Sequence, residues 1–199
     1  MKIAVQNTKG GVGKTRTAMF LAEAARRAGE QAAVWDIDQQ GTATSWADRC
    51  LESQTPLGFT VEPMNLAGLR RAEPAAGVVV LDTPPGNPQI TGAAFQWADI
   101  TVIPTGPTSD ETERAVETWG MGNGAPAGIL LTRYVKNERE SWDTLLQLRN
   151  SDAPDFETVI PRRVAIASAF GQPMPRSLGN YDKLYLELMQ VVNSIHESE

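Results

Sequence analysis

The sequence has little of two residue types on which protein chemistry often depends. Its 199 residues include one cysteine, Cys50, and one histidine, His196. A single cysteine excludes an intramolecular disulfide, a CxxC pair and a cysteine-ligated zinc or iron–sulfur site within one chain. His196 lies close to the C-terminus, where chains fray, so we expect it to be exposed and to have no catalytic role.

Long apolar runs and excess positive charge are also missing. No apolar stretch approaches the roughly 20 residues that span a bilayer, and the N-terminus enters a strand-like run with no signal-peptide pattern. The formal net charge is −6, which argues against a broadly basic surface for nucleic acid and leaves room only for a local basic patch. We therefore expect a cytoplasmic protein.

Short apolar runs alternate with helical patterns along the whole chain. Such runs are typical of parallel strands covered on both faces. Strand–helix alternation predicts a doubly wound α/β fold, a mostly parallel sheet flanked by helices, here as a single domain over residues 1–199. The expected strands are Lys2–Gln6, Ala32–Trp35, Val78–Leu81, Ile100–Ile103, Gly128–Leu131 and Thr158–Ile160. The expected helices are Lys14–Ala28, Asn87–Trp97, Glu111–Trp119, Glu138–Asn150 and Tyr181–Ile195.

A glycine-rich loop follows the first expected strand and opens the first expected helix. Glycines let backbone amides converge on phosphate oxygens, and the helix N-terminus adds its positive dipole end. In such a loop Lys14 reaches the β- and γ-phosphates and the Thr15 hydroxyl ligates Mg²⁺. We therefore expect ATP or ADP with Mg²⁺ to bind here. The residues of the loop are Lys9, Gly10, Gly11, Val12, Gly13, Lys14 and Thr15.

Two further apolar runs end in aspartate. Asp36 and Asp38 follow the second expected strand, and Asp82 follows Val78–Leu81. The carboxyl ends of parallel strands are where such sheets bind ligands, so we expect Asp82 to hold Mg²⁺ directly or through water. The segment after it, residues 83–86, would sense the γ-phosphate as a switch. Either run could instead be an ordinary strand that ends in solvated aspartates.

The loop sequence KGGVGKT resembles the deviant Walker A motif of the ParA/MinD ATPases, a subgroup of the P-loop NTPases. The resemblance implies that Lys14 serves its own nucleotide, while Lys9 reaches across an ATP-sandwiched homodimer to the partner's phosphates. Asp36–Gln39 is similar to the family's DxDPQ segment, with Gln39 in place of proline. This implies that Asp38 orients the attacking water and joins Thr15 and Asp82 at the metal, while Asp36 supports the switch.

Two later segments resemble the family's base-binding regions. Thr132 and Arg133 stand where the family often has Asn-Arg, and residues 160–176 resemble its IPxR…A…GxP segment, which lies against the purine. Arg16 stands where the family usually has a second threonine. The proline-rich residues 160–176 could instead be a connecting loop. The implied nucleotide contacts of these regions are Arg16, Thr132, Arg133, Pro161, Arg162 and Pro173.

From the length we expect no N-terminal helix-turn-helix, so the resemblance is to the short ParA type. It implies slow ATP hydrolysis accelerated by a small ParB- or centromere-binding-type activator. It also implies non-specific DNA binding by the ATP dimer, which would then be nucleoid-associated, and positioning of a plasmid, a chromosome or another intracellular cargo. The expected DNA contacts are Arg139, Arg149, Arg162, Arg163 and Arg176.

Other interpretations remain. The segment Tyr181–Glu199 carries one basic residue besides His196, Lys183, and ends in acid, unlike the basic membrane-targeting tail of MinD, so no membrane contact is expected. An ATP-dependent metabolic ligase on the same fold, of the dethiobiotin synthetase kind, is the main alternative, but Lys9 has no natural place in it. A module that uses nucleotide only structurally would not need Asp38 and Asp82.

Overall fold

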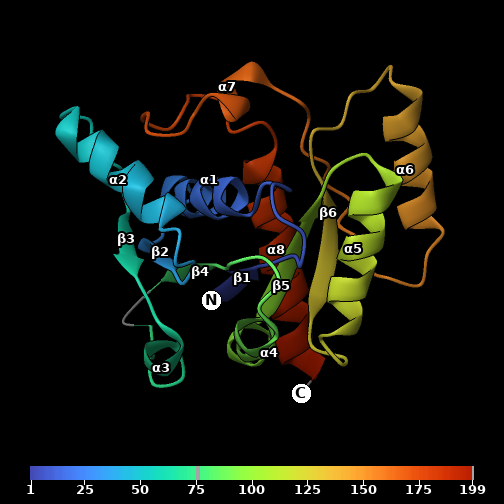
Figure 1. The fold of residues 1–199 in the computed structure, drawn as a ribbon, viewed down its shortest axis with the longest axis horizontal. Coiled ribbons are helices and arrows are strands. Elements are labelled where there is room, and N and C mark those ends of the chain that lie inside the picture. Colours follow the sequence, from blue (N-terminus) through green and yellow to red (C-terminus); the bar gives the residue numbers. More distant parts are fainter. Residues whose placement is uncertain (75–76, 199) are drawn as a thin grey trace.

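One parallel sheet forms the centre of the structure, a computed structural model that describes residues 1–74 and 77–198. Within these residues the sheet has six strands in the order β3-β2-β4-β1-β5-β6 (Figure 1). The strands are β1 (Lys2–Val5), β2 (Ala32–Asp36), β3 (Thr60–Pro63), β4 (Val78–Asp82), β5 (Ile100–Thr105) and β6 (Ala127–Leu131). The helices are α1 (Lys14–Arg27), α2 (Thr42–Glu52), α3 (Leu66–Leu69), α4 (Pro88–Trp97), α5 (Ser109–Gly120), α6 (Arg139–Arg149), α7 (Val164–Ala167) and α8 (Tyr181–Ser198).

The strand order reverses direction at β1. From β1 the chain moves outward to β2 and β3, returns to β4 beside β1, and continues on the other side through β5 and β6. A doubly wound sheet binds ligands outside the carboxyl ends of its strands at such a reversal. The predicted fold class is confirmed, and it places the end of β1 between the ends of β4 and β5.

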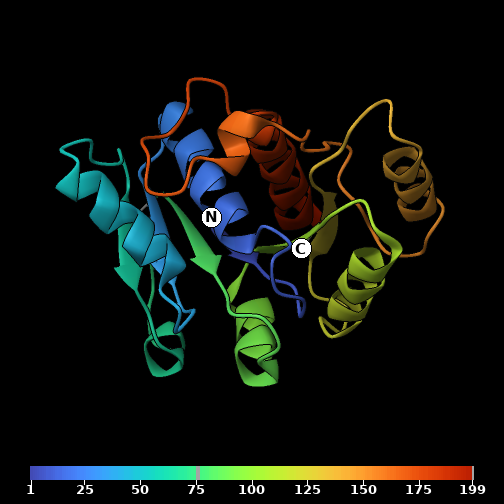
Figure 2. The same cartoon turned by 45° about the horizontal axis from the view of Figure 1, so that its top comes forward.

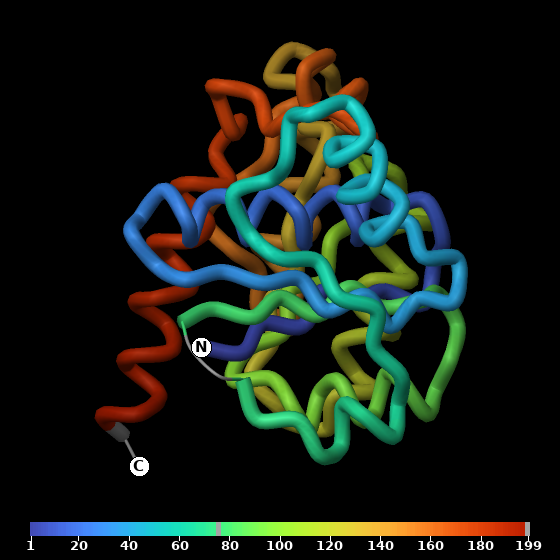
Figure 3. Tube along the Cα trace, turned by 90° about the vertical axis from the view of Figure 1, so that its left-hand side faces the viewer, coloured from blue at the N-terminus to red at the C-terminus, as the bar shows by residue number. Residues whose placement is uncertain are grey.

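Side chains of the strands alternate between two covered faces. Ile3 and Val5 of β1 belong to one core with α1 and α8, whereas Ala4 packs with Leu81 and with Ile90 of α4 on the other face. Figure 2 shows α1, α2, α7 and α8 on the first face and α3, α4 and α5 on the second. Figure 3, seen from the β3 edge, shows α2 and the chain around α7 on the same side of the sheet as α1.

Four elements of the structure were not predicted: the short helices α3 and α7, the longer helix α2 and the strand β3. In α2 the buried residues are Ala43, Trp46 and Cys50, whose spacing of three and four is the signal of an amphipathic helix. The polar residues between these three positions hide this pattern in the sequence. Strand β3 lies at the sheet edge with mostly exposed side chains, so it carries no apolar run that could reveal it.

The predicted strand Thr158–Ile160 is wrong. Residues 158–160 form no strand in the structure. Their backbone groups make other hydrogen bonds in place of a strand ladder. The amide of Thr158 donates to the Glu187 carboxylate of α8 at 3.0 Å, while Ile160 keeps one ladder-like bond to the Leu131 carbonyl at 2.9 Å. Pro161 follows and has no N–H with which to extend a ladder.

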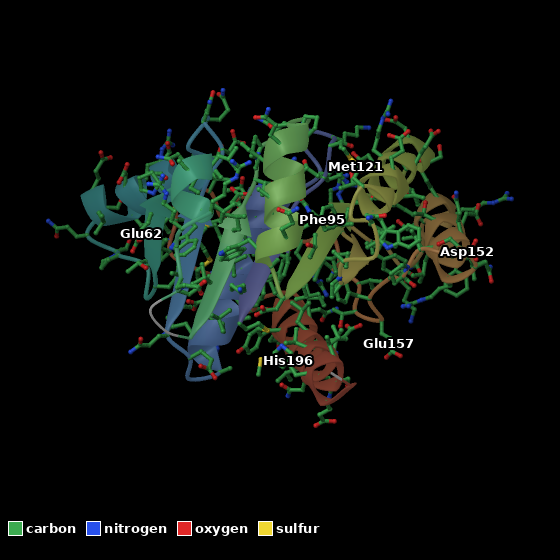
Figure 4. The ribbon with its side chains drawn as sticks, turned by 90° about the horizontal axis from the view of Figure 1, so that it is seen from below. Glu62, Phe95, Met121, Asp152, Glu157 and His196 are labelled. Atoms are coloured by element: carbon green, nitrogen blue, oxygen red, sulfur yellow. The ribbon has the colours of Figure 1, made fainter. Side chains whose placement is uncertain are left out.

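The other expected elements are confirmed to within three residues at each end. His196 is exposed on α8, as expected, and Figure 4, which views the molecule from the α4 side, shows it on a different helix from Phe95 of α4. Among the residues that the structure describes, no helix is long and apolar enough to cross a membrane.

Candidate functional site

The loop between β1 and α1 lies at the reversal point of the sheet and contains two glycines in a left-handed conformation. Gly11 and Gly13 have φ of 79° and 97°, left-handed values that glycine adopts without a Cβ penalty. Gly13 is the N-cap of α1, and no side-chain hydrogen bond caps this helix in the described structure. An uncapped helix N-terminus leaves backbone N–H donors and the positive dipole end available to an anion.

Lys14 folds back over this loop. Its side-chain Nζ donates to the carbonyl oxygen of Lys9 at 2.9 Å, and the residue is 7% exposed. Burial lowers the pKa of Lys14, and the nearby carboxylates of Asp82 and Asp38 partly oppose that change. The ammonium therefore lies inside the ring of the loop, where phosphate oxygens could replace the carbonyl as its partner.

Asp82 ends β4 as a buried and unpaired carboxylate. It is 1% exposed, and neither carboxylate oxygen has a hydrogen-bond partner among the described residues. Burial raises the pKa of Asp82 to about 7, helped by the neighbouring carboxylates of Asp36 and Asp38, and the nearby Thr15 side chain and Lys14 ammonium oppose that rise only in part. A buried polar group without a partner is costly, so this carboxylate is suited to hold a cation.

The oxygen donors around Asp82 fit Mg²⁺. This ion is usually bound by one or two carboxylates, with substrate phosphates and waters as the other ligands. Thr15 and Asp38 both line a cleft of about 450 Å³ beside the loop. In residues 1–74 and 77–198, no cluster of three or more His, Cys, Asp or Glu residues could hold a metal by itself. The donor set thus suits a metal that arrives with a nucleotide.

The two aspartates at the carboxyl end of β2 have different environments: Asp36 is its last residue, and Asp38 follows it. Asp36 is buried, and its Oδ2 accepts from the amide and the hydroxyl of Thr44, each at 2.9 Å. Its Oδ1 accepts from the amide of Asp38 at 3.2 Å. Asp36 therefore fixes the turn from β2 into α2. Asp38 is half-buried and borders the cleft, and its Oδ1 accepts from the Gln40 amide at 3.0 Å.

A second cavity, of about 150 Å³, adjoins the other side of the loop. It brings together segments that are far apart in the sequence, including the chain just after β6 and the last residues of α7. Gly10, Lys14 and Thr15 line the neighbouring cleft with Asp38. Pro173 is exposed and lines neither space. The predicted contacts that line the second cavity are Gly11, Val12, Gly13, Arg16, Thr132, Arg133, Pro161 and Arg162.

Several of these side chains are engaged by the protein itself. The Thr132 hydroxyl donates to the Thr105 carbonyl at 2.8 Å. The Arg133 guanidinium pairs with Glu111, in the first turn of α5. Arg16 donates through Nη2 to the carbonyl of Ala167 in α7 at 3.0 Å, while its buried Nε has no partner among the described residues. Arg16 thus ties the loop helix to α7 across the cavity.

Lys9 also has a partner within the chain. Its ammonium pairs with Asp110 of α5, and this ion pair lowers the pKa of Asp110. Asp110 and Glu111 were missed as site residues. The sequence does show two consecutive acids a few residues after β5. Because β5 pairs in parallel with β1, its carboxyl end lies beside the carboxyl end of β1.

Comparisons with known proteins agree with this geometry. Residues 3–175 match a family model described as the CobQ/CobB/MinD/ParA nucleotide binding domain. The maintenance of carboxysome distribution protein A of Gloeobacter kilaueensis is 36% identical over 167 residues, which cover 79% of this chain and 75% of that protein. The chromosome-partitioning ATPase Soj of Thermus thermophilus is 32% identical over an alignment of 236 residues, which covers 94% of this chain and 95% of that protein.

One solved structure illustrates the likeness in three dimensions. A crystal structure of a plasmid partition protein from Borrelia burgdorferi, bound to AMPPNP, matches with a TM-score of 0.75 at 17% identity. The match covers 97% of this chain and 98% of that chain. At this level of identity the likeness concerns the fold alone.

Proposed function

The chain belongs to the CobQ/CobB/MinD/ParA nucleotide-binding family, and from that premise we propose a ParA-type ATPase that dimerises when it binds ATP. Residues 1–199 would act as one cytoplasmic ATPase domain. Its ATP dimer would bind DNA non-specifically, associate with the nucleoid and position a DNA molecule or another intracellular cargo, with hydrolysis stimulated by a small ParB-type partner. The observation that carries the proposal is the different placement of the two lysines in one loop.

Lys14 and Lys9 would serve different phosphates. Lys14 is buried inside the loop, so its ammonium would bind a nucleotide held by the same subunit. Lys9 carries its ammonium outside the loop, with a side chain that is 30% exposed. A cation supplied by the second subunit makes neutralisation of the phosphates depend on dimerisation, which is the logic of an arginine finger.

The remaining residues would divide binding from hydrolysis. Thr15 and Asp82 would hold Mg²⁺, which neutralises phosphate charge when it is bound with ATP. Asp38 has a carboxylate at the cleft and would orient the attacking water. The cavity of about 150 Å³ is smaller than the roughly 300–1,000 Å³ typical of ligand sites. Arg16 and α7, which border it, would therefore move apart to admit the purine.

The choice of cargo rests on the relatives. Their names refer to carboxysome distribution and to chromosome partitioning, two tasks in which an ATPase positions something larger than itself. DNA contacts would come from exposed arginines such as Arg162 and Arg163, which border the second cavity. With a net charge of −6, such a site would have to be a small patch, and its binding should weaken steeply with salt.

The test measures mass by light scattering with ADP, with a non-hydrolysable ATP analogue, and with that analogue plus unrelated duplex DNA. We expect a dimer with the analogue only, and DNA binding by that dimer. Lys9→Ala should keep nucleotide binding and lose the dimer, whereas Lys14→Ala should lose nucleotide binding.

The exposed residue Lys136 offers a matched control, and Lys136→Ala should behave as the wild type. An unchanged dimer in Lys9→Ala would contradict the proposal. A monomer with every nucleotide, with ATP turnover that requires a small-molecule acceptor, would favour the metabolic ligase instead.

A further inference from the structure

The first turn of α5 holds two cations of the candidate site. Asp110 pairs with Lys9, which lies 101 positions earlier in the chain, and Glu111 pairs with Arg133. The two acids are consecutive and follow the helix N-cap Thr108. The first turn of α5 thus supplies one carboxylate to Lys9 and a second carboxylate to Arg133, which lines the second cavity.

Hydrogen bonds that do not involve the Lys9 side chain connect the loop to α5 and to β5. The Thr8 amide donates to the Thr118 hydroxyl of α5 at 3.1 Å. The Asn7 side chain donates to the Pro104 carbonyl of β5 at 3.0 Å and accepts from the Lys9 amide at 2.8 Å. Because these contacts do not involve the Lys9 side chain, it can leave Asp110 without rearrangement of the loop.

The Lys9–Asp110 pair lies at the rim of the site. The two side chains are 30% and 69% exposed, so a second molecule could reach the ammonium directly. Exposed ion pairs contribute little to stability. A phosphate carries more charge than a carboxylate and makes strong charge-assisted hydrogen bonds with a lysine. The phosphate of a second subunit should therefore displace Asp110.

We propose that Asp110 is a positioning residue that holds Lys9 against α5 in the nucleotide-free chain, so that forming the ATP dimer requires Lys9 to leave it. This inference rests on the proposed function, because the second partner of Lys9 is the phosphate bound by another copy of this chain. Asp110 thereby opposes dimerisation until the nucleotide supplies a better partner, which suppresses association without ATP.

The first experiment measures the dimer dissociation constant with saturating ATP analogue by sedimentation. Asp110→Asn should dimerise more tightly, by about 1.5- to fivefold for each pair released. A symmetric dimer releases two pairs, so the dissociation constant should fall by roughly twofold to 25-fold. Nucleotide affinity of the dilute monomer should not change, and Asp110→Glu should restore wild-type dimerisation. An equal or weaker dimer in Asp110→Asn overturns the proposal.

Glu113→Gln provides the matched control. Glu113 is exposed on the same helix, so this variant removes one negative charge from α5 without touching the Lys9 pair. A gain of similar size in both variants would mean that general charge, and not Asp110, opposes dimerisation, and would overturn the proposal.

The second experiment does not depend on dimerisation. It measures the rate at which an amine-reactive acylating reagent modifies Lys9 in nucleotide-free protein, with Lys136 as the internal reference. The rate at Lys9 should rise in Asp110→Asn and stay unchanged in Glu113→Gln. No rise in Asp110→Asn overturns the proposal.

The two experiments also separate this inference from the proposed function. A dimer lost in Lys9→Ala but unaffected by Asp110→Asn would overturn only the role of Asp110. If the wild type forms no dimer with the analogue, the proposed function fails, and the dimerisation step proposed here fails with it.

Discussion

Replacing Asp82 with asparagine is expected to stabilise the nucleotide-free protein at alkaline pH and to weaken its response to Mg²⁺ and nucleotide. Burial raises the pKa of Asp82 from the ordinary 3.8 to about 7. Between these values the folded chain keeps a proton that the unfolded chain releases. The stability of the wild type therefore falls as pH rises through this window, and the full cost is present above pH 7.

The size of the effect follows from the shift in pKa. One pKa unit corresponds to about 1.4 kcal/mol, so the raised pKa of Asp82 lowers the stability by on the order of 4 kcal/mol above pH 7, where the folded carboxylate is ionised. At pH 5.5 the folded carboxyl is protonated, and taking up that proton on folding costs about 2 kcal/mol. Asparagine has nearly the same shape and leaves a buried neutral amide, much as a protonated carboxyl would be left. The difference between the two proteins therefore isolates the charge.

The assay is urea unfolding at pH 5.5, 7 and 8.5 in the presence of a chelator, with Asp143→Asn as the control. Asp143 is an exposed residue of α6. The stability gain of Asp82→Asn should grow with pH, and the control should show no such trend. With Mg²⁺ and the ATP analogue the order should reverse, because a ligand stabilises the form that binds it better. A gain that is absent, or the same at every pH, would refute the reasoning.

Two further predictions concern stability. Trp46 is 1% exposed, contacts Phe20 and Phe170, and donates through Nε1 to the Gln172 carbonyl at 2.9 Å. Trp46→Ala should cost about 3–5 kcal/mol in urea unfolding, and Trp46→Phe about 1–2 kcal/mol, mainly for the unpaired carbonyl; equal costs would contradict this division. Burial would raise the pKa of Glu23, but Arg26 and Arg27 outweigh it and the net shift is downward. Its stabilisation is present above the unfolded pKa and is lost as pH falls through the lower folded value. The urea midpoint of Glu23→Gln should thus fall below that of the wild type at pH 7 and approach it toward pH 3. A difference that stays the same at both pH values would contradict a lowered pKa of Glu23.

The phosphate loop could be predicted because its signal is local. Glycines, Lys14 and Thr15 occupy a few consecutive positions between a strand and a helix, so backbone geometry alone brings them together. Most strands were predictable for a similar reason, since β1, β4 and β5 are buried on both faces and read as apolar runs. Strand β3 has one neighbour and exposed side chains, so its place depends on pairing with β2 and not on its own residues.

The partners of the site residues depended on tertiary structure. The sequence by itself determined the fold class, the family and the nucleotide-binding loop, because these follow from short patterns whose members are neighbours along the chain. Only the packed fold decided that Lys9 pairs with Asp110 and that the Thr132 hydroxyl donates to a backbone carbonyl. It also decided that the Asp82 carboxylate has no hydrogen-bond partner among the described residues. The physical reason is that these residues lie at the ends of strands that are neighbours in the sheet but not in the sequence. Which strands are neighbours, and which side chains are buried, depends on how the whole sheet packs.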